Sequence, residues 1–215
     1  MTGFSRRRVI GALSAAAAMS ASPIARAATC VTTPAGPEGP FFPVKIRETD
    51  ADLTMVRGAS GRAQGTVIEV SGRIVDKTCR PLVSALVEAW QANAAGRYDH
   101  PRDDSNPAPL DPNFQGFTRL YTDARGSFRF LTIKPGAYAV SDSWWRPPHI
   151  HFRVTPVSAP YLVTQMYFAG EELNAQDRLF NDIDPGARDR VAIDFSGTGA
   201  EGVPAGTFDM VVGAG

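Results

Sequence analysis

From Thr66 onward, short apolar runs recur along the chain at intervals set by residues that favour turns. Several runs alternate apolar and polar residues, which is the two-residue period of a half-buried strand. The intervals carry turn formers such as Lys134-Pro135-Gly136. Many short strands with frequent Pro and Gly favour an all-β fold, a two-sheet β-sandwich with long loops. The predicted strands are Val67–Asp76, Ala85–Gln91, Thr118–Tyr121, Ser127–Ile133, His149–Thr155, Leu162–Phe168, Val191–Phe195 and Thr207–Val212, with one short helix over Glu171–Phe180.

The first residues have the features of a targeting segment. Ser5–Ile10 contains consecutive arginines, a small apolar run follows, and Ala25-Arg26-Ala27 has the small-x-small pattern of a signal-peptidase site. We therefore expect residues 1–27 to be a twin-arginine signal peptide that directs a periplasmic or secreted protein. Without them the chain has 18 basic and 22 acidic side chains, because four arginines and no acids fall within the segment. This acidic balance argues against a nucleic-acid partner, and the apolar run is too short for stable membrane insertion.

Residues 28–65 are rich in Pro, Gly and Thr and predict an extended N-terminal arm laid over a catalytic domain at residues 66–215. We expect the two phenylalanines of Gly39–Pro43 to be buried against that domain. The only cysteines of the chain are Cys30 and Cys79. In an oxidising compartment such a pair predicts a disulfide bond, although two separate buried thiols would also fit.

One irregular segment, from Asp99 to Gly116, is unusually long for a loop within a small β domain. It contains four prolines and Phe114, and it begins directly after Tyr98. A solvated excursion is the simpler interpretation. Its position instead favours a role as a pocket wall, together with Gly39–Phe42.

The stretch Trp145–Val154 carries the strongest chemical signal. His149, His151 and Arg153 alternate there with apolar residues, so a strand would place both imidazoles on one face and the apolar residues in the core. Two histidines on an exposed sheet face are often only solvated. This chain, however, has three histidines in all, and two of them are clustered beside an arginine. The pattern therefore favours half of a rigid metal site.

Two imidazoles need further ligands, and the type of ligand selects the metal. A third imidazole from His100 would favour zinc, whereas a carboxylate such as Asp142 would complete a site for ferrous iron. Phenolates from Tyr98 and Tyr138, at strand ends, would favour a trivalent ion. Two phenolates, two imidazoles and a hydroxide would hold Fe(III) without net charge. The remaining tyrosines lie inside or beside strands, as packing residues do: Tyr121, Tyr161 and Tyr167.

Four spaced motifs resemble those of the intradiol ring-cleavage dioxygenases, with the iron-bearing chains of the protocatechuate 3,4-dioxygenase branch as the most similar members. The resemblance covers about residues 36–170, in order, and a further stretch at Thr164–Phe168 continues it. The motifs are Gly96-Arg97-Tyr98, Leu110-Asp111-Pro112-Asn113-Phe114, Thr132-Ile133-Lys134-Pro135-Gly136-x-Tyr138 and Trp145-Arg146-Pro147-x-His149-Ile150-His151-Phe152.

The resemblance implies that a catecholic compound is cleaved with O2 at a non-haem Fe(III) site. The iron ligands that it implies are Tyr98, Tyr138, His149 and His151. The substrate would displace Tyr138 from the metal, and O2 would attack the substrate ring, giving a cis,cis-muconate-type product. Arg146 would stabilise negative charge that builds on the ring, and Gln165 would be its companion. The resemblance leaves open the ring substituents and whether an oligomer or a second subunit completes the pocket.

Two other classes of protein would use the same residues differently. A non-catalytic binding module on a transthyretin-like (prealbumin-like) sandwich would keep the histidines as structural residues. A zinc hydrolase would use His149, His151 and His100, would be colourless, and would remain active when Tyr98 is replaced by Phe.

Overall fold

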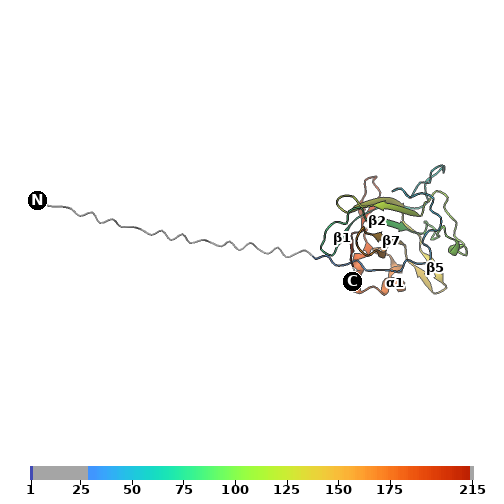
Figure 1. Ribbon diagram of the computed structural model, residues 1–215. Coiled ribbons are helices and arrows are strands. Elements are labelled where there is room, and N and C mark those ends of the chain that lie inside the picture. Colours follow the sequence, from blue (N-terminus) through green and yellow to red (C-terminus); the bar gives the residue numbers. More distant parts are fainter. Residues whose placement is uncertain (2–28, 214–215) are drawn as a thin grey trace.

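The structure is a computed structural model that describes residue 1 and residues 29–213. Residues 2–28, where nearly all of the predicted signal peptide falls, and residues 214–215 lie outside the described part. Strands make up most of the regular structure (Figure 1). They are β1 (Val67–Asp76), β2 (Leu86–Trp90), β3 (Phe117–Tyr121), β4 (Ser127–Ile133), β5 (Tyr138–Ser141), β6 (Trp144–Arg146), β7 (His149–Thr155), β8 (Leu162–Phe168), β9 (Ala192–Ile193), β10 (Gly197–Thr198), β11 (Pro204–Thr207) and β12 (Met210–Val212). The helices are α1 (Arg178–Asn181) and three 3₁₀ helices, η1 (Pro101–Asp103), η2 (Glu172–Gln176) and η3 (Pro185–Arg190).

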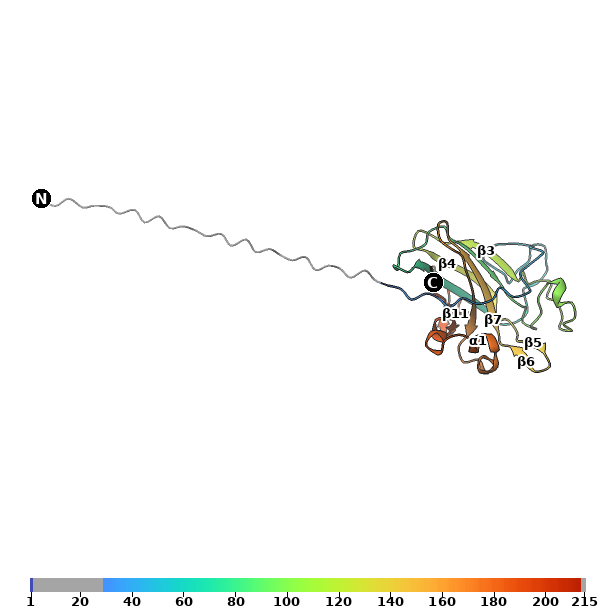
Figure 2. The ribbon, with the colours of Figure 1, turned by 60° about the horizontal axis from the view of Figure 1, so that its bottom comes forward.

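The strands form two five-stranded sheets and a separate hairpin. The first sheet has the order β10-β11-β1-β12, with β4 also paired to β1. The second has the order β3-β2-β7-β8-β9. The hairpin β5–β6 lies at one end of the molecule near α1 in both views (Figures 1 and 2).

Apolar side chains from both sheets meet in one core. The ring of Phe152 on β7 lies with its centroid 6.1 Å from those of Phe128 and Phe130 on β4 and 5.2 Å from that of Phe208. Burial of a large apolar side chain contributes roughly 1.5–3 kcal/mol, so this contact between the sheets is a main source of stability. The predicted two-sheet β-sandwich is confirmed.

Most of the predicted strands lie where the pattern placed them. The bounds of β1, β4, β7 and β8 are those predicted, and β2 and β3 differ by one residue at their ends. Long runs of β-branched and aromatic residues with turns on either side specify these elements locally.

The predicted strand Thr207–Val212 was wrong in its continuity. β11 ends at Thr207 and β12 begins at Met210, and the two pair with successive parts of β1. Between them, the amide of Phe208 donates to the carbonyl of Ser71 at 2.7 Å. A Cβ on Gly72 would lie 2.0 Å from the carbonyl oxygen of Phe208, so this close approach of two backbones requires glycine.

The predicted helix Glu171–Phe180 is also interrupted. η2 ends at Gln176 and α1 begins at Arg178, because Asp177 between them has the extended backbone angles φ −78° and ψ 123°. The Asp177 carboxylate accepts a hydrogen bond from the amide of Phe180 and caps α1. A capping residue in the middle of an apolar periodic stretch divides it into two short helices.

Several short elements did not stand out in the sequence. β5 and β6 span only four and three residues and were not among the predicted strands. The predicted strand Val191–Phe195 is reduced to β9, and Val191 is instead the C-cap of η3. Elements this short carry too few residues to show a period.

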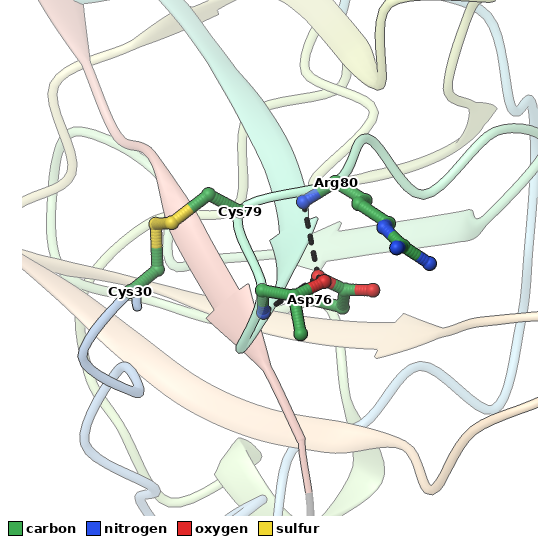
Figure 3. The surroundings of a disulfide bond; sticks show 5 residues. Cys30, Asp76, Cys79 and Arg80 are labelled. Atoms are coloured by element: carbon green, nitrogen blue, oxygen red, sulfur yellow. Dashed lines mark hydrogen bonds between the residues drawn. A yellow bond between two sulfur atoms is a disulfide. The ribbon is translucent and has the colours of Figure 1, made fainter. Parts of the chain in front are cut away.

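The arm begins beside β12 of the first sheet, where the amide of Thr33 donates to the carbonyl of Val211 at 3.1 Å, and continues beside the second sheet. Cys30 at its start forms a disulfide bond with Cys79, as predicted, in the turn between β1 and β2 (Figure 3). That turn is held by the Asp76 carboxylate, which accepts hydrogen bonds from the amides of Thr78 and Arg80. Further on, Gly36 donates its amide to the carbonyl of a residue in β8 at 2.9 Å. None of the helices in the described residues is long and apolar enough to cross a membrane.

Candidate metal centre

Four side chains from three separate stretches of the chain converge at one end of the sandwich. The ring centroids of Tyr98 and Tyr138 are 5.6 Å apart, and those of Tyr138 and His149 are 5.7 Å apart. The centroids of His149 and His151 are separated by 4.9 Å, and those of His151 and Tyr98 by 6.4 Å. Each ring therefore neighbours two others, and the four enclose a small common space.

The histidines are placed by β7. His149 and His151 are two residues apart on one strand, so they share the face that points away from the core, while Ile150 and Phe152 point into it. Trp90, opposite His151 in the paired strand β2, stacks on the imidazole with planes inclined by 9°. Packing on both sides of the strand thus limits the movement of both imidazoles.

The tyrosines are brought together by a tight contact between two loops. The carbonyl of Asn93 accepts hydrogen bonds from the amides of Gly96 and Gly136, at 3.0 and 2.9 Å. Gly96 has a φ of +79°, and a Cβ there would lie 2.2 Å from the carbonyl oxygen of Ala137. Only glycine allows this approach, which sets Tyr98 beside Tyr138.

Three of the four side chains of this cluster have a buried polar atom without a partner in the described part of the protein. The buried oxygen of Tyr98 and Nε2 of His149 have no hydrogen-bond partner among the described residues, and neither has Nδ1 of His151. His149 Nδ1 lies 2.7 Å from the carbonyl oxygen of Pro147, so this nitrogen donates and Nε2 keeps its lone pair free. Unpartnered polar atoms in a buried cluster are costly unless a ligand completes them. Two phenols and two imidazoles suit a trivalent iron ion, and the residues present fit that metal.

Burial keeps these groups in their uncharged forms. It raises the pKa of Tyr98 well above its ordinary value, with a further contribution from Tyr138, and it also raises the pKa of Tyr138. Burial lowers the pKa of His149 well below its ordinary value, and it lowers the pKa of His151 to about 3. Neutral imidazoles are ready to bind a metal, whereas the phenols must lose their protons to a cation that binds there.

Arg146 lies beside the cluster and is 4% exposed, so it is not a surface ion-pair residue. Its Nη2 donates to Oε1 of Gln165 at 2.6 Å and to the hydroxyl of Tyr167 at 3.3 Å. Nε lies 3.0 Å from Oδ1 of Asp177. The Tyr167 hydroxyl also donates to Oε1 of Gln165 at 3.0 Å. The pairing of Arg146 with Gln165, which the resemblance implied, is therefore present.

The sheet register places one residue of this network opposite each of three clustered side chains. Every pair joins a candidate ligand to a neighbour on the adjacent strand. The pairs are Tyr138 with Arg146, His149 with Tyr167, and His151 with Gln165. Cross-strand neighbours lie about 5 Å apart, so ligands and network are built as two adjacent rows.

The arm covers the cluster from outside. Phe41 stacks on Tyr98 with centroids 4.6 Å apart, and Phe42 meets Trp90 edge-on at 5.0 Å. The carbonyl of Pro37 accepts a hydrogen bond from Nε2 of Gln165 at 2.8 Å. The two phenylalanines, expected to be buried, are half-buried, and they pack against residues of the site.

The long loop contributes to a cavity of about 660 Å³ between Asp103–Ala108 and the hairpin β5–β6. Tyr138 and Trp145 also line this cavity. The loop therefore forms a wall near the cluster, as expected from its position. Gly39–Phe42 does not line the same cavity, because that stretch packs directly on Tyr98 and Trp90.

Other candidate ligands are not brought to the cluster. His100 caps η1, where its Nδ1 accepts from the amide of Arg102, and exposed Asp142 lies in the β5–β6 turn. Within the described residues, no group of three or more His, Cys, Asp or Glu side chains is arranged to hold a metal. The structure thus forms neither the three-histidine zinc site nor the site with two histidines and a carboxylate. Asp177 was missed by the sequence reasoning, since no motif marked it.

Comparison with known proteins shows that the chain is similar to dioxygenases. Residues 38–213 match a family model described as "Dioxygenase". The chain is 44% identical over 197 residues to the protocatechuate 3,4-dioxygenase beta chain of Burkholderia cepacia, covering 82% of this chain and 83% of that one. It is 30% identical to catechol 1,2-dioxygenase 2 of Acinetobacter lwoffii, covering 69% of this chain and 55% of that one. A solved dioxygenase domain, from a dioxygenase carbohydrate-binding protein fusion of Streptomyces sp. SirexAA-E, has a TM-score of 0.63 and 30% identity, covering 86% of this chain and all of that domain.

The β-sandwich with its clustered phenols and imidazoles is thus the fold and site of an oxygenase. The chain belongs to the intradiol ring-cleavage dioxygenase family. It is an enzyme of the intradiol dioxygenase class, with similarity to a protocatechuate 3,4-dioxygenase beta chain over most of its length.

Proposed function

We propose that Tyr98, Tyr138, His149 and His151 bind Fe(III) and that the enzyme cleaves a catecholic ring between its two hydroxyl-bearing carbons. The observation that carries this proposal is the buried circle of two phenols and two imidazoles, in which Tyr98, His149 and His151 each have a polar atom without a hydrogen-bond partner among the described residues. When bound, the ferric ion would supply Lewis acidity that draws electron density from a chelating catechol.

The side chains of the protein have separate tasks in this proposal. Tyr138, which begins β5 next to the cavity, is placed to give way to the substrate and to accept one of its protons on the phenolate oxygen. Tyr98, His149 and His151 remain in place, because packing from Phe41 and Trp90 fixes two of the three. The Arg146 guanidinium, held beside Tyr138 by strand pairing, stabilises negative charge that develops on the ring.

The proposed reaction consumes O2 and a small catechol, with or without ring substituents. Its product is a cis,cis-muconate-type dicarboxylate. The arm and the aromatic residues around the cluster exclude water, which strengthens the interactions of Arg146 with the substrate. Similarity to a beta chain also supports the proposal that a second subunit or a further copy of the chain borders the cavity.

The direct test loads purified protein with iron and adds catechol under air. Stoichiometric O2 uptake with formation of a muconate is the expected result. Formation of a yellow semialdehyde by cleavage next to the diol, or no O2 uptake by iron-loaded protein with any catechol, would contradict the proposal. A His149→Ala variant serves as a control, because loss of one ligand should abolish both iron retention and turnover.

We also propose that the protein is exported by the twin-arginine pathway. Two features support this: the arginines at positions 6–8 and the disulfide between Cys30 and Cys79, which suits an oxidising compartment. A double Arg6→Lys, Arg7→Lys variant should stay in the cytoplasm, whereas the natural chain should appear in the periplasmic fraction. If the variant and the natural chain were found in the same proportions in the cytoplasmic and periplasmic fractions, export by the twin-arginine pathway would be excluded.

A further inference from the structure

Asp177 is the only buried carboxylate that the described contacts place within ion-pair distance of Arg146. Its side chain is fully buried, and Oδ1 lies 3.0 Å from Nε of Arg146. An uncompensated guanidinium at this depth would be costly, and a buried carboxylate at contact distance offsets that cost. The two residues therefore form one buried charge pair.

The carboxylate of Asp177 is itself fixed by two further donors. Nε1 of Trp144 on β6 donates to Oδ1 at 3.0 Å, and the amide of Phe180 in α1 donates to Oδ2 at 3.1 Å. Asp177 thus links the hairpin strand that carries Arg146 to the start of α1. The break between η2 and α1, where its backbone becomes extended, gives the carboxylate this position.

The contacts of Arg146 leave one of its nitrogens available. Nε lies 3.0 Å from the Asp177 carboxylate in an ion pair that lacks hydrogen-bond geometry, and Nη2 donates to Gln165 and Tyr167. No hydrogen bond or ion pair in the described part of the chain uses Nη1. A guanidinium is planar and rigid, so the hydrogen bonds of Nη2 and the ion pair near Nε together restrict the direction of Nη1.

We propose that Asp177 is a positioning residue for the ring-cleavage reaction: it holds the Arg146 guanidinium by a buried ion pair so that Nη1 is directed toward the substrate. This inference rests on the proposed function of the site, because Arg146 needs a bound catechol on which to act. Gln165 supports the same guanidinium from the other side, and it is in turn held by the arm through Pro37.

The charge of Asp177 can be removed with little change in shape. Asn is a good N-cap residue, so Asp177→Asn keeps one acceptor oxygen, which can serve the amide of Phe180, while it removes the negative charge. Asp177→Glu keeps the charge on a longer side chain. Asp182→Asn is the matched control, because this exposed aspartate follows α1 and its side chain makes no hydrogen bond or ion pair among the described contacts.

In the iron-loaded enzyme, Asp177→Asn should lower kcat by about tenfold or more and leave KM for catechol within about threefold, because the lost interaction acts on charge that develops during the reaction. Iron content and visible colour should be unchanged. Asp177→Glu should recover part of the loss, and Asp182→Asn should match the natural enzyme. In an Arg146→Gln background, Asp177→Asn should have less than about a twofold further effect. An equal loss in both backgrounds would overturn the proposal.

A second measurement needs neither iron nor turnover. In the metal-free protein, Asp177→Asn and Arg146→Gln should each lower the denaturant midpoint, and the double variant should be more stable than the sum of the two losses predicts. Additive losses would show that the residues are not paired and would overturn the inference. If the natural protein binds no iron and cleaves no catechol, the proposed function fails, and this cycle still decides whether Asp177 holds Arg146.

Discussion

The ring of Phe41 stacks on the ring of Tyr98, with centroids 4.6 Å apart and planes inclined by 27°. The contact joins the N-terminal arm to a candidate iron ligand. Replacing Phe41 with Ala should lower the free energy of unfolding by about 1–3 kcal/mol, because a half-buried aromatic contact is lost. The same change should speed the release of iron to a chelator, since Tyr98 becomes more accessible to water.

Chemical denaturation and a chelator assay measure these two effects. Val44→Ala is a suitable control, because Val44 lies in the same arm and is 63% exposed. Unchanged rates of iron release in Phe41→Ala would show that the arm does not protect the centre.

The disulfide should stabilise the fold through the unfolded state. Cys30 and Cys79 close a loop with a sequence separation of 49, for which chain entropy gives at most about 4 kcal/mol. A variant with serine at both positions should unfold at a lower denaturant concentration, because its free energy of unfolding should be lower by about 2–4 kcal/mol. The natural protein treated with a reductant should behave like that variant. If reduction changes nothing, the arm is held by its other contacts alone.

Glu88 provides a pH-dependent contribution to stability. It is 2% exposed and lies on β2 between Arg119 and Arg153 of the adjacent strands, to which its carboxylate is paired. Burial alone raises the pKa of Glu88, but hydrogen bonds from Arg153 and then Arg119 outweigh it, so the pKa is lowered below 4.5. A lowered carboxyl pKa stabilises the fold above the unfolded pKa, and this stability is lost as pH falls through the folded pKa.

Glu88→Gln should therefore cost about 1–3 kcal/mol at pH 7 in the metal-free protein. The difference in free energy of unfolding between this variant and the natural chain should shrink as the pH is lowered below the pKa of a free glutamate carboxyl group. Urea denaturation across this pH range makes the comparison, with Glu201→Gln at an exposed site as the control. A difference that grows in acid would contradict the assigned direction of the pKa.

The two kinds of tyrosine near the centre should respond differently to loss of the hydroxyl. Tyr98→Phe should reduce iron occupancy and colour, because it removes a proposed ligand. Tyr167→Phe should retain both iron and colour, since the Tyr167 hydroxyl contacts Arg146 and Gln165 and is not one of the four ligands. Metal analysis and absorption spectra separate the outcomes. A colourless Tyr167→Phe protein with full iron would require a different ligand set.

The sequence predicts much of the sandwich because local pattern determines it. β7 is the clearest example: alternation alone places His149 and His151 on one face and Phe152 in the core, and the structure confirms both. The short strands β5 and β6 carry no such pattern. Their pairing depends on contacts that form only when the sheets have assembled.

The sequence indicated some residues of the site more clearly than others. The alternating pattern indicated the histidines, whereas Tyr98 and Tyr138 stood out among five tyrosines mainly through the family motifs. Asp177 was not predicted because its role depends on a break in a stretch that reads as one helix. The distance in sequence from Arg146 also gave no sign that the two residues meet.

The central claim is that two phenolates and two imidazoles hold a ferric ion that binds catechol. Metal analysis and the visible spectrum of the purified protein, recorded before and after anaerobic addition of catechol, test it most directly. We predict near-stoichiometric iron with a strong tyrosinate-to-iron charge-transfer band that shifts when catechol binds. A colourless protein that rejects iron, or that holds zinc in its place, would contradict the account.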